Sequence, residues 1–210
     1  MDIQAILLDI EGTTTPVAFV YEVLFPYARR HLRGYLEADG QAAQVGEFES
    51  LMDADSKSTP LKELQGRIWE DGYRRGEITG EVFPDVPAAF ERWRRRGLQL
   101  GIFSSGSVLA QQLLFRHSSA GDLTGFLGWY FDTTTGAKTD PESYRRIAVA
   151  MTQTPATILF ISDTVRELDA ARDAGLHTRV AMRPGNVPPQ DHHGHGPIAN
   201  FNELFADPRS

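Results

Sequence analysis

The chain has 210 residues, 41% hydrophobic and 23% charged, which suits one domain with at most a modest insertion and excludes a disordered chain. The net charge of −7 has the wrong sign for a protein that neutralises nucleic-acid phosphates, so we expect no nucleic-acid partner. Cysteine is absent, which excludes disulfides, thiolate nucleophiles and cysteine-ligated metal sites.

Short apolar runs that end in polar residues predict the strands of a sheet, beginning with residues 3–8. Such nearly continuous runs are typical of strands that are buried on both faces of a parallel sheet. Helix-like stretches over residues 108–117 and 165–174 follow two of these runs, as in α/β folds. The sequence therefore predicts a doubly wound, mostly parallel α/β sheet with strands at residues 3–8, 98–103, near 129–131, 157–161 and 177–182.

The segment between the first two strands is far longer than a crossover connection needs. Apolar residues recur in it at helical spacing, Pro26 is suited to starting a helix, and Thr59 and Pro60 suit the N-cap and first position of another. We therefore expect a helical cap at residues 15–80, inserted into a core made of residues 1–14 and 81–210. The alternative is that this segment belongs to one continuous core.

Residues 184–197 are rich in proline, glycine and histidine, which predicts a loop. Its histidines, His192, His193 and His195, could bind a metal ion. The alternative is that the histidines belong to a solvated surface segment, which is the usual case on a glycine-rich loop.

Polar side chains follow the predicted strands at the edge where an open parallel sheet binds its ligands. Carboxylates together with a lysine and hydroxyl groups could hold a hard divalent cation and a phosphate, and Mg²⁺ fits best. Each residue also has a plain structural interpretation as a turn residue, a helix cap, a solvated lysine or, for Glu167, a first-turn acid. The residues concerned are Asp9, Glu11, Thr13, Ser104, Ser105, Lys138, Ser162, Asp163 and Glu167.

The order of these residues resembles the motifs of the haloacid dehalogenase superfamily. Its first motif appears as DIEGT at residues 9–13, and the other three at Ser104, Lys138 and Asp163. Glu11 replaces the second aspartate of most phosphatases of the superfamily. This glutamate is characteristic of the enolase-phosphatases of methionine salvage, also called acireductone synthases. The chain is similar to that branch in LDIEGTTTP, LFPYA, FSSGSVLAQQLLF, FDT and RPGN, and least similar in residues 41–59 and the histidine-rich tail.

The resemblance implies a covalent route, in which Asp9 attacks phosphorus and forms an aspartyl-phosphate. Glu11 would protonate the leaving oxygen and then deprotonate the hydrolytic water. Ser104 and Ser105 would bind the phosphoryl group, and Lys138 would neutralise the charge that it shares with Asp9. Asp9, Glu11 and Asp163 would hold Mg²⁺.

The implied reaction converts 2,3-diketo-5-methylthiopentyl-1-phosphate to acireductone (1,2-dihydroxy-3-keto-5-methylthiopentene) and phosphate, by enolisation and then hydrolysis. The enolisation base stays open, with Glu11 the most economical candidate. The cap would close over the site and recognise the methylthio group through apolar side chains such as Phe19, Tyr21, Leu24 or Trp69. The alternative for these aromatic residues is ordinary packing within the cap.

Two other functions stay open. One is another Mg²⁺-dependent small-molecule phosphatase, or a dehalogenase, on the same fold, although a dehalogenase needs no leaving-group acid such as Glu11. The other is a catalytically silent scaffold, which has no reason to keep Asp9, Lys138 and Asp163. Because the sequence has neither a signal-peptide pattern nor an apolar run of about 18 residues, we expect a cytoplasmic monomer that acts on a small phosphorylated molecule and has no membrane partner.

Overall fold

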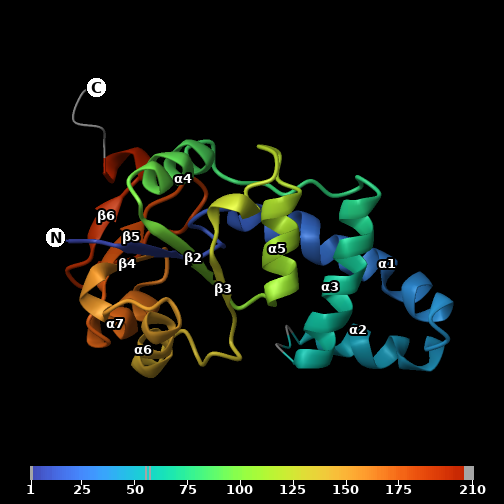
Figure 1. The fold of residues 1–210 in the computed structure, drawn as a ribbon. Helices are drawn as coiled ribbons and strands as arrows, with labels where there is room; N and C mark the ends of the chain where they lie inside the picture. Colours follow the sequence, from blue (N-terminus) through green and yellow to red (C-terminus); the bar gives the residue numbers. More distant parts are fainter. Residues whose placement is uncertain (1, 55, 57, 206–210) are drawn as a thin grey trace.

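The structure is a computed structural model that describes residues 2–54, 56 and 58–205. Residues 1 and 206–210 of the predicted core, and residues 55 and 57 of the predicted cap, lie outside the described residues. Figure 1 shows the sheet and its covering helices in one lobe, and a group of helices to one side of it. None of the helices in the described ranges has both the length and the apolar character needed to cross a membrane.

In the described residues the strands form one six-stranded sheet of order β3-β2-β1-β4-β5-β6, and every neighbouring pair is parallel. This order reverses direction at β1, whose neighbours are β2 and β4. The predicted fold class is confirmed, and the predicted strands agree with the observed ones to within two residues at each end. The strands are β1 (Ala5–Leu8), β2 (Gln99–Phe103), β3 (Trp129–Phe131), β4 (Ile158–Ser162), β5 (His177–Ala181) and β6 (Gly196–Ile198).

Helices cover both faces of the sheet, which explains the unbroken apolar runs. Ile6 and Leu8 of β1 share a buried cluster with apolar residues of α4 and α5, whereas Ala5 and Leu7 share one with residues of α6 and α7. Since successive strand residues point to opposite faces, both sets must be apolar. These helices are α4 (Val86–Arg95), α5 (Val108–Arg116), α6 (Pro141–Ala150) and α7 (Val165–Asp173), and short 3₁₀ turns lie at Thr124–Phe126 and Pro155–Thr157.

The long segment between β1 and β2 is helical. In α1, Pro26 lies in the first turn, where its missing N–H interrupts no helical hydrogen bond. Helix α3 begins at Thr59, one residue before the predicted start, and helix α2 was not predicted. Figure 1 shows α1, α2 and α3 together beside α5. The segment comprises a π-helical turn at Phe19–Leu24, α1 (Phe25–Ala38), a 3₁₀ turn at Ala42–Gln44, α2 (Val45–Asp53) and α3 (Thr59–Arg74).

The chain leaves the sheet lobe and returns to it at neighbouring points. The amide of Phe83 on the returning chain donates a hydrogen bond of 2.9 Å to the carbonyl of Thr14 on the departing chain. Thr13, Thr14 and Thr15 are fully buried. The departing and returning segments are therefore fixed to each other beyond the carboxyl end of β1.

The prediction of a loop over residues 184–197 is wrong at its C-terminal end, because residues 196–198 form the edge strand β6. Pro197 is compatible with this position because an edge strand leaves one row of its backbone groups unpaired. The solvated-segment alternative is wrong for His195, which is 3% exposed. Its ring nitrogens lie 2.7 Å from the Thr178 hydroxyl and 3.1 Å from Asp169, and His193 lies 2.7 Å from the same carboxylate. The loop is therefore attached to α7, and a further 3₁₀ turn follows it at Phe201–Glu203.

Candidate active site

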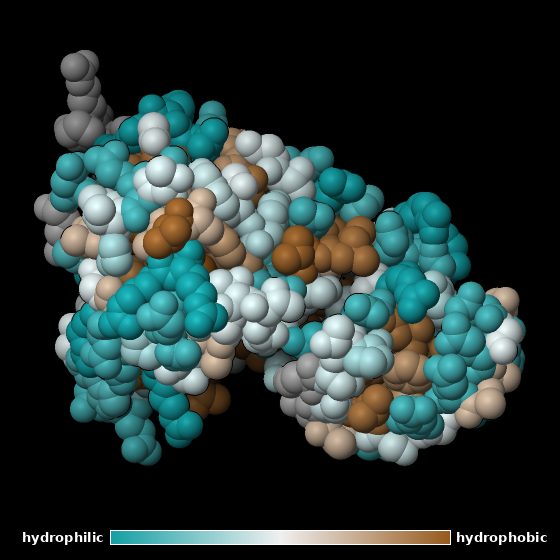
Figure 2. Space-filling model, turned by 60° about the horizontal axis from the view of Figure 1, so that its bottom comes forward, coloured by the Kyte–Doolittle hydropathy of each residue, from teal (hydrophilic) through white to brown (hydrophobic). Residues whose placement is uncertain are grey.

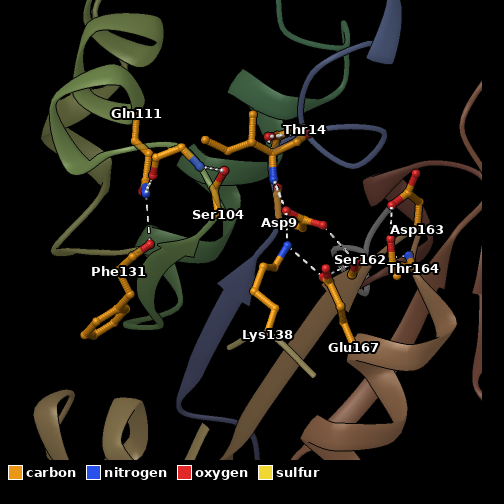
Figure 3. Close-up of polar contacts among 12 residues, drawn as sticks. Asp9, Thr14, Ser104, Gln111, Phe131, Lys138, Ser162, Asp163, Thr164 and Glu167 are labelled. Atoms are coloured by element: carbon orange, nitrogen blue, oxygen red, sulfur yellow. Dashed lines mark hydrogen bonds and ion pairs between the residues drawn. The ribbon is translucent and has the colours of Figure 1, made fainter. Parts of the chain in front are cut away.

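Asp9 lies directly after β1, at the point where the strand order reverses. This is where open α/β sheets place their ligands. Asp9 is 4% exposed, and its two carboxylate oxygens are held differently (Figure 3). Oδ1 accepts a hydrogen bond of 2.8 Å from the Ile10 amide and lies 2.7 Å from Nζ of Lys138, while Oδ2 lies 2.8 Å from the Ser162 hydroxyl. The carboxylate therefore has a fixed orientation.

Lys138 lies between two carboxylates, because its Nζ is also 2.7 Å from Oε2 of Glu167. Burial lowers the pKa of Lys138, but the negative charges of Asp9 and Glu167 outweigh burial and raise that pKa above its ordinary value. The Tyr144 hydroxyl donates a hydrogen bond of 2.7 Å to the Lys138 carbonyl and so holds the lysine loop. Lys138 is therefore a charged group of the site and not a solvated loop lysine, and Glu167 is an ion-pair partner as well as a first-turn acid.

The loop between β2 and α5 carries the two predicted phosphoryl-binding serines. Ser104 is 4% exposed, and its hydroxyl oxygen accepts a hydrogen bond of 3.2 Å from the Gly106 amide. Gln111, from α5, donates hydrogen bonds of 2.9 Å to the carbonyls of Gly106 and Phe131. Ser105 lines the same pocket as Ser104. The loop is thus held from one side by its own helix and from the other by the end of β3, as Figure 3 shows.

Asp163 follows β4, and its Oδ1 accepts a hydrogen bond of 3.0 Å from the Thr164 hydroxyl. Burial, and then the charge of Asp9, raise the pKa of Asp163 to about 6. The side-chain amide of Asn186 reaches it from the loop after β5, with Nδ2 3.3 Å from Asp163 Oδ2 and 2.8 Å from the Gly12 carbonyl. Burial and the charge of Asp9 also raise the pKa of Glu167.

These residues fit a divalent cation. In the described part of the chain, Lys138 contacts both Asp9 and Glu167, and the charge of Asp9 adds to burial in raising the pKa values of Asp163 and Glu167. As they lie in the structure, no three histidine, aspartate or glutamate side chains among the described residues are grouped so that they could hold a metal ion by themselves, so a cation here would take part of its coordination from water and phosphate oxygens. Mg²⁺, which binds through one or two carboxylates and completes its coordination with water and phosphate oxygens, suits such a site.

A pocket of about 320 Å³ lies between the sheet lobe and the helical segment. Figure 2 shows the hollow between the two lobes. The predicted residues Tyr21, Leu24 and Trp69 line it, whereas Phe19 is buried in the core cluster and does not. The Trp69 indole donates a hydrogen bond of 2.8 Å to the Leu24 carbonyl, which fixes both residues. The lining of the pocket combines Glu11, Ser104 and Ser105 with apolar residues of the helical segment, among them Val20, Leu24, Phe25, Met52, Leu61 and Trp69.

The structure thus brings Asp9 and Lys138 into direct contact and places Asp163 near them. It places Glu11, Ser104 and Ser105 on the pocket wall. Two residues that hold these groups, Gln111 and Asn186, were not predicted from the sequence. Both lie in strings that carried the family resemblance, which was the available signal.

The chain is similar to known proteins over most or nearly all of its length. A family model described as haloacid dehalogenase-like hydrolase matches residues 3–175. The chain is 48% identical to the enolase-phosphatase E1 of Synechococcus elongatus, over 89% of this chain and 92% of that protein. It is 45% identical to the enolase-phosphatase E1 of Klebsiella oxytoca, over 98% of both chains. The crystal structure of the UTR4 protein of Saccharomyces cerevisiae superposes with a TM-score of 0.86 and 34% identity, over 96% of this chain and 100% of that one. The chain therefore belongs to the haloacid dehalogenase-like hydrolases and, among them, to the enolase-phosphatase E1 family.

Proposed function

We propose that this protein is the enolase-phosphatase of methionine salvage, which converts 2,3-diketo-5-methylthiopentyl-1-phosphate to acireductone and phosphate. Near full-length relatives carry the name of this activity. The observation in the structure that supports it most is the buried Asp9 carboxylate, held 2.7 Å from Lys138 beside a pocket that Ser104 and Ser105 line. A nucleophile, a cation and hydroxyl donors are what phosphoryl transfer requires.

In the hydrolytic half of the reaction, Asp9 attacks phosphorus and forms an aspartyl-phosphate, which water then hydrolyses. Ser104 and Ser105 bind the phosphoryl oxygens, and Lys138 neutralises the negative charge that accumulates between the phosphoryl group and Asp9. Glu11 protonates the leaving oxygen and then takes a proton from the attacking water. Asp9, Asp163 and Glu11 would hold Mg²⁺, which when bound supplies positive charge for the phosphoryl and carbonyl oxygens of the substrate.

In the enolisation half, a base takes a proton from the carbon that bears the phosphate. Glu11 is our candidate, because it lines the pocket in the same loop as Asp9. Apolar side chains that line the pocket, among them Leu24 and Trp69, bind the methylthio end and exclude water from the reacting carbons.

The structural organisation that we propose has a core of residues 1–14 and 81–210 and a cap of residues 15–80. The pocket lining supports this division, because it combines residues of both parts. The cap should close over the bound substrate, with hinges near residues 15–16 and 80–84. Hydrogen exchange with and without an unreactive substrate analogue would test this: slower exchange in the cap residues that face the pocket is expected, and unchanged exchange would contradict closure.

We further propose that the protein works as a monomer in the cytoplasm, on a small phosphorylated substrate and without nucleic-acid or membrane partners. Light scattering during size-exclusion chromatography would test the monomer. A mass near twice the 23.4 kDa of the chain would contradict it.

Phosphate release in the presence of Mg²⁺ tests the activity itself, with the diketo phosphate compared against ordinary sugar phosphates. We expect the diketo phosphate to be the preferred substrate and acireductone to appear together with phosphate. Preference for a sugar phosphate would favour another phosphatase of the same fold. No release from any monoester would favour a silent scaffold.

A further inference from the structure

The loop of residues 183–186, which follows β5, contacts the turn after Asp9 at two consecutive carbonyl groups. Nε of Arg183 donates a hydrogen bond of 2.9 Å to the Thr13 carbonyl. Nδ2 of Asn186 donates one of 2.8 Å to the Gly12 carbonyl. Residues far apart in the sequence are therefore joined directly beside the site.

The same amide nitrogen of Asn186 lies 3.3 Å from Oδ2 of Asp163. An amide NH₂ group has two hydrogens, so it can serve the carbonyl and the carboxylate together. Because both neighbours are acceptors, the nitrogen and not the oxygen of the side chain must face them. The side-chain oxygen of Asn186, Oδ1, is buried and has no hydrogen-bond partner among the described residues.

Gly12 shows how closely these groups are packed. Its φ is +66°, a left-handed conformation that glycine adopts without strain. A Cβ atom at this position would overlap Asp163 Oδ2 and lie 2.8 Å from Asn186 Nδ2. The Asp163 carboxylate therefore occupies the space that a side chain at position 12 would need.

The base of the loop is firmly anchored through Arg183. Its side chain is 2% exposed, and its Nη1 lies 2.8 Å from Oδ2 of Asp85. The guanidinium also lies over the rings of Phe83 and Phe201, at 4.7 and 4.2 Å from their centroids. Asn186 thus extends from a fixed point toward Asp163.

We infer that Asn186 is a positioning residue that orients the Asp163 carboxylate for cation binding. The inference rests on the proposed function insofar as Mg²⁺ is the cation, but Mg²⁺ binding can be measured without turnover. Residues that hydrogen-bond to metal-binding carboxylates typically change metal affinity by about 10- to 100-fold when they are replaced.

The experiment is a calorimetric titration of the metal-free protein with MgCl₂ alone. Asn186→Ala should bind Mg²⁺ about 10- to 100-fold more weakly than the wild type. Asn202→Ala is the matched control, because Asn202 is an exposed asparagine outside the site. The affinity of Asn202→Ala for Mg²⁺ should equal that of the wild type. Equal affinities for wild type and Asn186→Ala would overturn the inference, as would a wild type that binds no Mg²⁺.

A second measurement separates positioning from a merely structural role. If Asn186 acts through cation binding, saturating Mg²⁺ should restore phosphate release by Asn186→Ala to near the wild-type rate, whereas Ser104→Ala should stay slow. A deficit in Asn186→Ala that Mg²⁺ does not restore would overturn the inference. If Asn186→Ala does not fold, Asn186→Leu, which fills similar space without a donor, is titrated instead with the same expectation. If the wild type binds Mg²⁺ but releases no phosphate, the proposed function fails and the titration still decides the role of Asn186.

Discussion

Replacing Lys138 by methionine removes a charge from the centre of the site while keeping a side chain of similar length. Nζ of Lys138 lies 2.7 Å from an oxygen of Asp9 and from one of Glu167. At an effective dielectric constant of about 20, each such pair corresponds to about 6 kcal/mol of Coulomb attraction, which desolvation largely offsets. Removing one partner of a buried pair typically costs about 3–5 kcal/mol, because the remaining charges stay buried. We expect Lys138→Met to lose that much unfolding free energy at about pH 9, above the pKa of about 8 that Glu167 has in the folded protein.

The loss should be smaller at pH 5. Burial and the charge of Asp9 already raise the pKa of Glu167, and removing the lysine raises it further. A carboxyl group whose pKa is higher in the folded than in the unfolded protein binds protons preferentially when folded. Because the pKa of Glu167 is raised to about 8 already in the wild type, the additional destabilisation in Lys138→Met is complete only above the higher folded pKa of the variant, and it disappears as the pH falls below about 8.

Urea denaturation in the presence of EDTA measures this effect for the wild type, Lys138→Met, Glu167→Gln and the double variant. The double variant should be more stable than additivity predicts, with a coupling of about 1–3 kcal/mol. Phosphate release by Lys138→Met should fall by about 10³-fold or more, equivalent to about 4 kcal/mol of transition-state stabilisation. Additive free energies, or a loss that is independent of pH, would refute the electrostatic reasoning.

Other substitutions test the remaining parts of the structure. Asp9→Asn should abolish phosphate release without unfolding the protein, which a phosphate assay and circular dichroism check together; substantial residual turnover would exclude the aspartyl-phosphate route. In heavy water with Mg²⁺, NMR should show deuterium entering unhydrolysed diketo phosphate with Asp9→Asn but not with Glu11→Gln, and exchange with both variants would remove Glu11 as the base. Gly12→Ala should weaken Mg²⁺ binding measured by calorimetry, because its Cβ needs the space of Asp163; unchanged affinity would contradict the packing argument. Arg183→Met should lower the unfolding free energy by about 3–5 kcal/mol, since Asp85 loses its buried partner, against less than about 1 kcal/mol for the half-exposed Arg145→Met; equal losses in urea denaturation would contradict this.

Strands β1, β2 and β4 could be predicted because they are almost fully buried, so that each leaves a nearly continuous apolar run in the sequence. Strand β6 leaves no such run, since Pro197 and Gly196 make up most of its three residues and it pairs on one edge only. Helix α2 buries few residues, among them Val45 and Phe48, and so shows a weaker periodic pattern than α3.

In the site, the motif residues could be predicted from the sequence. The residues that hydrogen-bond to them and fix their position, such as Asn186, could not. Asn186 acts on Gly12 across most of the length of the chain, and no local pattern encodes that contact. Glu167 was ambiguous in the sequence, because a first-turn glutamate also interacts favourably with the helix dipole. Only the position of Lys138 in the structure shows that Glu167 forms an ion pair with this lysine.

The hydrogen bond between Phe83 and Thr14 has a consequence for how such an enzyme can diversify. Because the chain departs from and rejoins the sheet lobe at adjacent points, the intervening helices can change in length or be exchanged without altering the register of β1 against β2. Insertions are tolerated best where their two ends lie close together. A helical segment grafted from a relative should therefore bring its own substrate preference to an unaltered phosphoryl-transfer site.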